Sequence, residues 1–213
     1  MVVSAEAWTR LLSSGAPRFY EPDAVLLRQG EPASYVLPLV AGHVRVTRTS
    51  HDGSVLVLGV RGAGEILGDI AVLGEGGRSA TVVAIERCET RIIPAARFFL
   101  LVRSMGLERQ LFRHITARIR EGEAWQADLA ALPAGPRLAR TLIRLAVHGP
   151  NGSADVVLDQ AELGLAAGLS RSTVAAELGR LRKRGVVVTS RRRIVITDLA
   201  ALQALTESSH GNV

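Results

Sequence analysis

Cysteine is almost absent from this chain of 213 residues, since Cys88 is the only one. A single cysteine can form no internal disulfide and can hold neither a thiolate zinc cluster nor an iron–sulfur cluster. No apolar run reaches the roughly 18 uncharged residues of a membrane span. The N-terminal segment, Met1 to Leu12, carries Glu6 and Arg10 and lacks the basic start of a secretory signal. We therefore expect a cytoplasmic protein with no membrane contact.

Lysine is equally scarce, because Lys183 is the only lysine among 26 basic residues. With 20 acidic residues the formal net charge is +6. Residues 137–213 hold 11 basic against 6 acidic residues, whereas residues 1–100 hold 10 of each. A basic excess in the last third favours binding to a polyanion such as duplex DNA, with a steep salt dependence. A solvated basic surface is the alternative.

Short β-prone stretches separated by glycines occupy residues 24–93. The expected strands are Ala24–Gln29, Tyr35–Val40, His43–Thr49, Ser54–Arg61, Ala80–Ile85 and Glu89–Ile93. Asp52-Gly53 between two of them is a strong β-hairpin signal. A short helix from Ser4 to Leu12, with Ser4 as N-cap, precedes the strands. Such closely spaced strands predict a sandwich or a barrel.

One loop of this region suits a small phosphorylated sugar. The backbone N–H of Gly68 can face an anion, and the carboxylate of Asp69 can accept hydrogen bonds from sugar hydroxyls. Arg78 and Ser79 can bind a phosphate through charge and hydroxyl. The same residue types also occur in ordinary turns, so a purely structural role is the alternative.

Beyond Pro94 the apolar residues follow helical spacing from about Met105 to Ala131. A helix longer than about 25 residues exceeds what one small domain usually covers. Its apolar face is typical of a dimer seam, with a core helix on the β domain as the alternative. The candidate seam residues are Leu111, Ile115, Ile119 and Leu129.

Residues 133–136, Pro-Ala-Gly-Pro, end this helix and predict a hinge. After a helix over Arg137–Ala146, residues 159–181 have the order of a helix-turn-helix, in which Gly168 lets two helices cross closely. Ser170 caps the second helix. The first-turn residues that it directs toward base edges in the major groove are Arg171, Ser172 and Thr173.

A basic hairpin follows, with expected strands over residues 186–189 and 194–197. The further DNA-binding candidates are Arg180, Arg191, Arg192 and Arg193, which suit contacts to phosphates. A basic hairpin alone is usually a solvated turn, but directly behind a helix-turn-helix it indicates a wing. A short helix over Asp198–Thr206 and a disordered tail over Glu207–Val213 complete the expected chain.

With these motifs the chain resembles the CRP/FNR family of bacterial transcription regulators over nearly its whole length. The matches are Gly64-Glu65-Ile66 through Gly68-Asp69, the run Arg78-Ser79-Ala80-Thr81-Val82, and Gly168-Leu169-Ser170-Arg171 followed by Thr173-Val174. The resemblance implies an α+β architecture: an N-terminal β-roll of the jelly-roll-like double-stranded β-helix type, a long dimerisation helix, and a C-terminal winged helix-turn-helix. The implied domains are residues 1–102, 103–135 and 136–213.

The resemblance further implies a homodimer that binds duplex DNA sequence-specifically, controlled by an effector such as cyclic AMP or cyclic GMP. RNA polymerase is the partner that it implies for activators. The implied effector-binding residues are Gly68, Asp69, Ile70, Arg78, Ser79 and Glu123.

Two departures from the family leave the effector open. Members that bind cyclic AMP carry glutamate at the position of Asp69, and they carry a Thr-Ser pair at the positions of Gly122 and Glu123. A member that senses another signal, or that has a vestigial pocket, is therefore the alternative. The family's iron–sulfur cysteines and its cysteine and histidine heme ligands are missing, so no metal, heme or cluster is expected.

An enzyme is the competing class. The five histidines are scattered, with no two at metal-ligand spacing: His43, His51, His114, His148 and His210. Residues 168–172 lack the final glycine of a nucleophile elbow. We therefore expect no catalysis. A regulatory module that serves a partner protein would fit the first hundred residues but would leave the winged helix unexplained.

Overall fold

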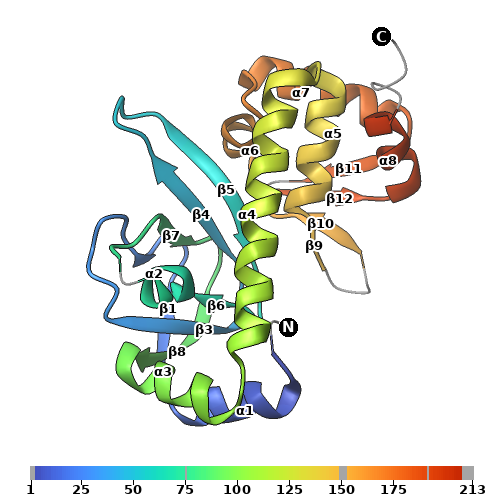
Figure 1. Ribbon diagram of the computed structural model, residues 1–213. Helices are drawn as coiled ribbons and strands as arrows, with labels where there is room; N and C mark the ends of the chain where they lie inside the picture. Colours follow the sequence, from blue (N-terminus) through green and yellow to red (C-terminus); the bar gives the residue numbers. More distant parts are fainter. Residues whose placement is uncertain (1–2, 75, 149–152, 191, 208–213) are drawn as a thin grey trace. The chain divides into compact units, whose positions relative to one another are not determined.

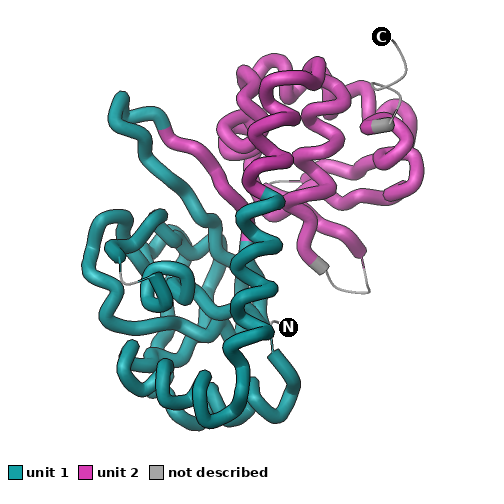
Figure 2. The backbone as a smooth tube through the Cα atoms, viewed as in Figure 1, with its two compact units in different colours: residues 1–54, 61–121 teal, residues 55–60, 122–213 magenta. Residues whose placement is uncertain are grey.

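The computed structural model (Figure 1) describes residues 3–74, 76–148, 153–190 and 192–207. Its contacts divide the chain into two compact units (Figure 2), unit 1 with residues 1–54 and 61–121, and unit 2 with residues 55–60 and 122–213. Among the described residues, no helix combines the length and the apolar composition that crossing a bilayer requires.

The N-terminal half is built on two four-stranded sheets (Figure 1). The first sheet has the order β1 (Ala16–Tyr20), β8 (Cys88–Pro94), β3 (Tyr35–Ala41) and β6 (Ile66–Leu67). The second has the order β2 (Val25–Leu27), β7 (Thr81–Ala84), β4 (Val44–Thr49) and β5 (Val55–Arg61). Each sheet therefore pairs early strands with strands that come about 35 to 75 residues later, as a roll requires.

All six expected strands are confirmed, with ends that differ by up to two residues. The sequence missed β1, whose first four residues are exposed and include Pro17, and β6, which is only two residues long. Residues from both sheets meet in one apolar core that contains Leu27, Leu37, Val82 and Cys88. Burial raises the pKa of the Cys88 thiol to about 11, which makes it an unreactive core residue.

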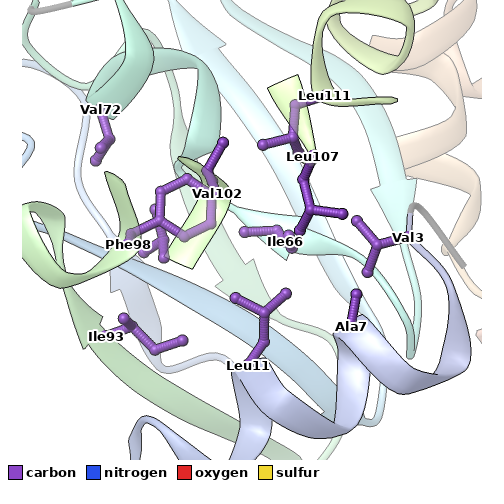
Figure 3. Close-up of a cluster of buried hydrophobic side chains, with 11 residues drawn as sticks. Val3, Ala7, Leu11, Ile66, Val72, Ile93, Phe98, Val102, Leu107 and Leu111 are labelled. Atoms are coloured by element: carbon purple, nitrogen blue, oxygen red, sulfur yellow. The ribbon is translucent and has the colours of Figure 1, made fainter. Parts of the chain in front are cut away.

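A second core forms where helices cover the first sheet (Figure 3). It joins residues of β3, β6 and β8 to four helices: α1 (Ala5–Ser13), α2 (Asp69–Leu73), α3 (Ala95–Ser104) and the start of α4 (Glu108–Ala131). The side chain of Ser4 accepts from the N–H of Ala7, which confirms the expected N-cap. Helix α3 is a separate helix that the sequence did not predict. It ends before Gly106, whose positive φ of 62° breaks the helical path and turns the chain into α4.

Unit 2 has the order of a winged helix-turn-helix. Its elements after α4 are α5 (Ala134–Leu145), β9 (Val147–His148), β10 (Ala154–Val156), α6 (Gln160–Ala167), α7 (Arg171–Lys183), β11 (Val187–Ser190), β12 (Arg193–Ile196) and α8 (Leu199–Glu207). The strands form one sheet in the order β11-β12-β10-β9. These elements and the N-terminal sheets confirm the predicted α+β class.

The expected hinge over residues 133–136 is wrong in its extent. Helix α5 begins at Ala134, so the break between α4 and α5 is only Leu132 and Pro133. Pro136 lies in the first turn of α5, where a missing N–H removes no helical hydrogen bond. The expected tail beyond Glu207 lies outside the described residues.

Candidate effector and DNA-binding sites

The carboxylate of Asp69 is a buried group with spare hydrogen-bonding capacity. Asp69 begins helix α2 (Asp69–Leu73) and is 1% exposed. Its Oδ1 accepts a hydrogen bond from Nη1 of Arg118 at 3.4 Å, whereas its Oδ2 is buried with no partner in the described part of the chain. A buried oxygen without a partner is costly, so a hydroxyl donor at this point would stabilise the site.

Arg78 is folded back onto the chain beside Asp69. Its Nη1 donates to the carbonyl of Gly68 at 3.0 Å and its Nη2 to the carbonyl of Tyr35, while the guanidinium lies 5.0 Å from the Tyr35 ring centroid. Burial lowers the pKa of Arg78. Gly68 has φ +80°, and a Cβ there would fall well inside contact distance of Nη1, so the arrangement requires glycine. Three of the five N–H groups of Arg78 remain for other acceptors.

Arg118 is a site residue that the sequence analysis missed. Its Nη2 lies 2.7 Å from Oε2 of Glu65, and the same Oε2 lies 3.4 Å from Nε of Arg61. Arg118 therefore ties α4 to both carboxylates of the loop that includes β6 and the start of α2. Burial lowers the pKa of Arg61, and the nearby charge of Arg118 adds to that effect. The motif around Glu65 was visible in the sequence, but its basic partner lies 53 residues away.

The other expected effector residues are placed differently. Ser79 is exposed. Ile70 is 37% exposed and borders an apolar groove of about 400 Å³, together with Leu73 and Phe112. Glu123 is exposed and belongs to unit 2, whereas the other five residues belong to unit 1. A role for Glu123 in effector binding stays a prediction.

His114 gives the site a pH dependence. Its Nε2 is buried without a partner among the described residues, and its pKa is lowered by burial and by the charge of Arg118. The folded state therefore takes up a proton less readily than the unfolded state, whose histidine titrates near pH 6.5. His114 therefore does not lower the free energy of unfolding above that pH, and it lowers this free energy increasingly as the pH drops below it. We expect acidification from pH 7.5 to 5.5 to lower the melting temperature more in the wild type than in His114→Gln, and equal losses would contradict this assignment.

The exposed face of α4 differs from the predicted seam. Phe112 is 69% exposed and Ile119 is 54% exposed, and they are seven residues apart, as one position of a heptad repeat requires. Leu111 is 2% exposed in the core of unit 1, and Leu129 points at the turn of the helix-turn-helix, 3.2 Å from where a Cβ on Gly168 would lie. Both leucines therefore pack against other residues of the same chain. Phe112, which the sequence analysis did not select, joins Ile119 on the exposed face.

The turn between α6 and α7 is set by caps at both helices. Asp159 and Glu162 form a capping box at the start of α6, and Gly168 ends it with φ +61°. The hydroxyl of Ser170 accepts from the N–H of Thr173 at 3.1 Å, which confirms Ser170 as the N-cap of α7. Arg171 is exposed and makes no hydrogen bond or ion pair within the described residues.

Trp125 anchors the second half of α4 to this helix pair. It is 6% exposed, and its Nε1 donates to the carbonyl of Ala166 in α6 at 3.0 Å. The guanidinium of Arg144 lies 4.8 Å from the Trp125 ring centroid, and its Nη1 donates to the carbonyl of Leu58 in β5 at 2.7 Å. Trp125 thus joins α4 to α6 and, through Arg144, to α5.

The wing arginines are not equivalent. Nη2 of Arg193 bonds Asp155, which is 1% exposed, so Arg193 neutralises a buried carboxylate, although its own side chain is 40% exposed. A phosphate contact by Arg193 stays a prediction. Arg192 lies 3.9 Å from Glu162 in a looser pair. Arg180 lies 2.5 Å from Glu177 on the same helix and is 72% exposed. Arg191 lies outside the described residues.

This difference between the wing arginines is testable. We expect Arg193→Met to lower the free energy of unfolding by about 1–3 kcal/mol, because it leaves a buried carboxylate without its charged partner. Arg192→Met should lower DNA affinity with little loss of stability. Urea unfolding and DNA titration of both variants separate the two roles. A stable Arg193→Met protein with weakened DNA binding would show that Arg193 is a phosphate contact after all.

Comparisons with known proteins match two domains of this chain. Residues 17–104 match the family of cyclic nucleotide-binding domains, and residues 136–205 match the Crp-like helix-turn-helix domains. The chain is 29% identical over 197 residues to the "Cyclic AMP receptor protein" of Thermus thermophilus, which covers 92% of this chain and 87% of that protein.

Solved structures show the same fold. FixK2 from Bradyrhizobium japonicum has a TM-score of 0.72 at 25% identity, covering 90% of this chain and 96% of its own. CLP of Xanthomonas campestris, a global regulator described as c-di-GMP responsive, has a TM-score of 0.73 at 22% identity. The match covers 91% of this chain and 99% of the CLP chain. At that identity the likeness shows the fold alone.

A cyclic nucleotide-binding domain followed by a Crp-like helix-turn-helix domain defines a class of transcription regulators. The chain belongs to the CRP/FNR family of transcription regulators, as the two matched domains and the curated relatives show. Within the described residues, no three histidine, cysteine, aspartate or glutamate side chains gather as metal ligands would.

Proposed function

We propose that this protein binds operator DNA as a homodimer, with α7 of each copy in the major groove and the wing on the flanking phosphates. The observation that carries the proposal is Arg171, an exposed arginine that has no partner within the described residues, at the capped start of α7 in a matched Crp-like domain. An arginine in this position can bond O6 and N7 of guanine together. The protein is then a binding protein and not an enzyme, and it acts in the cytoplasm, where the DNA is.

The dimer forms along α4 in this proposal. The exposed Phe112 and Ile119 provide the apolar positions of the seam, and the two copies present their α7 helices to two half-sites. We assign residues 1–102 to the effector domain, 103–135 to the dimerisation helix and hinge, and 136–213 to DNA binding. Contact with RNA polymerase stays a prediction from the family.

The effector site fits a cyclic nucleotide. The unpartnered Oδ2 of Asp69 can accept a bond from a ribose hydroxyl, and the remaining N–H groups of Arg78 with the Ser79 hydroxyl can bind the cyclic phosphate. The nucleotide would supply negative charge and hydroxyl donors at this point. Since Arg118 already contacts Asp69, binding there would act directly on α4.

A different signal is the second candidate. Both Nη atoms of Arg78 donate to backbone carbonyls, and Arg118 already bridges Glu65 and Asp69. These bonds satisfy much of the site without a ligand, which favours a member that responds to another signal or has a vestigial pocket.

Two experiments test these proposals. For DNA, we expect selection from random duplexes to recover a twofold-symmetric site, and sedimentation to show two protein chains on each duplex. Recovery of no common site would overturn the DNA proposal. For the effector, we expect heat of binding from cyclic AMP or cyclic GMP in calorimetry that Arg78→Ala abolishes and Ser79→Ala weakens. No heat from either nucleotide would favour the second candidate.

A further inference from the structure

The second turn of helix α7 exposes small residues. Val174, Leu178 and Leu181 are buried and hold the helix in unit 2. On the opposite side, Arg171 and Ser172 are exposed in the first turn, Ala175 and Ala176 in the second, and Arg180, Arg182 and Lys183 toward the end of the helix.

In the first two turns of α7, few side-chain hydrogen-bonding groups are free to contact a base, since the exposed Arg180, Arg182 and Lys183 lie beyond these turns. The Oγ of Ser170 lies 2.9 Å from Oγ of Ser172 and 2.8 Å from Oγ1 of Thr173, so the three hydroxyls bond one another. Arg171 is the group at the start of α7 that makes no such bond in the described part of the chain. In the second turn, the exposed side chains of Ala175 and Ala176 therefore present methyl groups and no hydrogen-bond donors or acceptors.

The packing of the chain does not explain why Gly179 is a glycine. Nothing lies within 4 Å of the place where its Cβ would be, and its backbone needs no positive φ. Glycine is also the poorest helix former after proline. A glycine on an open face does, however, let the helix backbone come close to a ligand.

We infer that this face reads thymine by shape: the methyl groups of Ala175 and Ala176 pack against thymine C5-methyl groups next to the guanine that Arg171 contacts. The inference rests on the proposed function, since it needs α7 in the major groove. Thymine is the base that presents a methyl group there, and alanine is a side chain that contacts it without making hydrogen bonds. Gly179 allows the approach that such short side chains require.

Deoxyuridine provides a direct test, because it lacks only the methyl group of thymine. With the site selected from random duplexes, each half-site thymine is replaced in turn by deoxyuridine and the affinity is measured with the full-length protein. We expect at least one replacement per half-site to weaken binding about fourfold, the effect of one buried methyl group. Replacements outside the half-sites should have no effect.

A double variant assigns the effect to the alanines. In Ala175→Gly with Ala176→Gly, the ratio of thymine to deoxyuridine affinities should fall toward one, whereas a general loss of helix stability would weaken both duplexes alike. Ala200→Gly, on the exposed part of α8, is the matched control and should keep the wild-type ratio.

The outcomes separate this inference from the proposed function. Specific binding that no deoxyuridine replacement weakens would overturn the methyl readout and leave the DNA-binding proposal standing. A deoxyuridine effect that survives in the double variant would also overturn it, because another residue would then read the methyl group. If no specific site is selected at all, the proposed function fails and the inference fails with it.

Discussion

Replacing Gly68 by alanine is expected to lower the free energy of unfolding by about 3–5 kcal/mol. The left-handed φ of +80° at this position costs a residue with a Cβ about 1–2 kcal/mol. The new Cβ would also displace the guanidinium of Arg78 and lie 3.1 Å from Cδ1 of Leu27. Arg78 would then lose its bond to the Gly68 carbonyl, and hydrogen bonds of charged groups contribute about 1.5–3 kcal/mol.

Gly53→Ala is the matched control for this variant. Gly53 has nearly the same φ, +83°, but nothing lies within 4 Å of its Cβ position. It should therefore show only the backbone cost, about 1–2 kcal/mol. Urea unfolding followed by circular dichroism measures both. Equal losses in the two variants would show that Arg78 does not depend on Gly68.

Trp125→Ala should cost about 3–5 kcal/mol, the range for truncation of a buried aromatic side chain. The loss includes the bond from Nε1 to the Ala166 carbonyl and the stacking of Arg144 on the ring. Because Ala166 lies in α6, the variant should also weaken DNA binding, although Trp125 is far along the chain from Arg171.

Trp125→Phe separates packing from hydrogen bonding. Phenylalanine keeps a ring for Arg144 but lacks the indole N–H, so about 1 kcal/mol of stability should be lost. Thermal unfolding of both variants, together with DNA titration, tests this account. A Trp125→Ala protein as stable as the wild type would mean that α4 does not depend on this anchor.

Local patterns predicted the elements but not all of their ends. Alternating and helical spacing predicted six strands and the long helix, because their apolar faces repeat regularly. Helix α3 was missed since its residues continue the apolar spacing up to Gly106, and the backbone break there carries no side-chain signal. Helix α5 begins earlier than expected because Pro136 lies in its first turn, where proline is compatible with a helix.

The sites were predictable only where a motif is contiguous. Asp69, Arg78 and the capped turn at Ser170 follow from short runs of sequence. Arg118 and Trp125 act on partners more than 40 residues away, and such pairs depend on the tertiary fold. For the same reason the sequence could not show that Arg193 pairs with the buried carboxylate of Asp155.

Arg171 is the residue that we expect to contact a base. The most direct measurement compares wild type and Arg171→Ala by fluorescence anisotropy on the selected duplex and on a scrambled one. If Arg171 contacts a base, we expect the affinity ratio of the two duplexes to fall about 5- to 140-fold in Arg171→Ala, equivalent to about 1–3 kcal/mol. Arg10→Ala, an exposed arginine of α1, should keep the wild-type ratio. An unchanged ratio in Arg171→Ala would contradict the account.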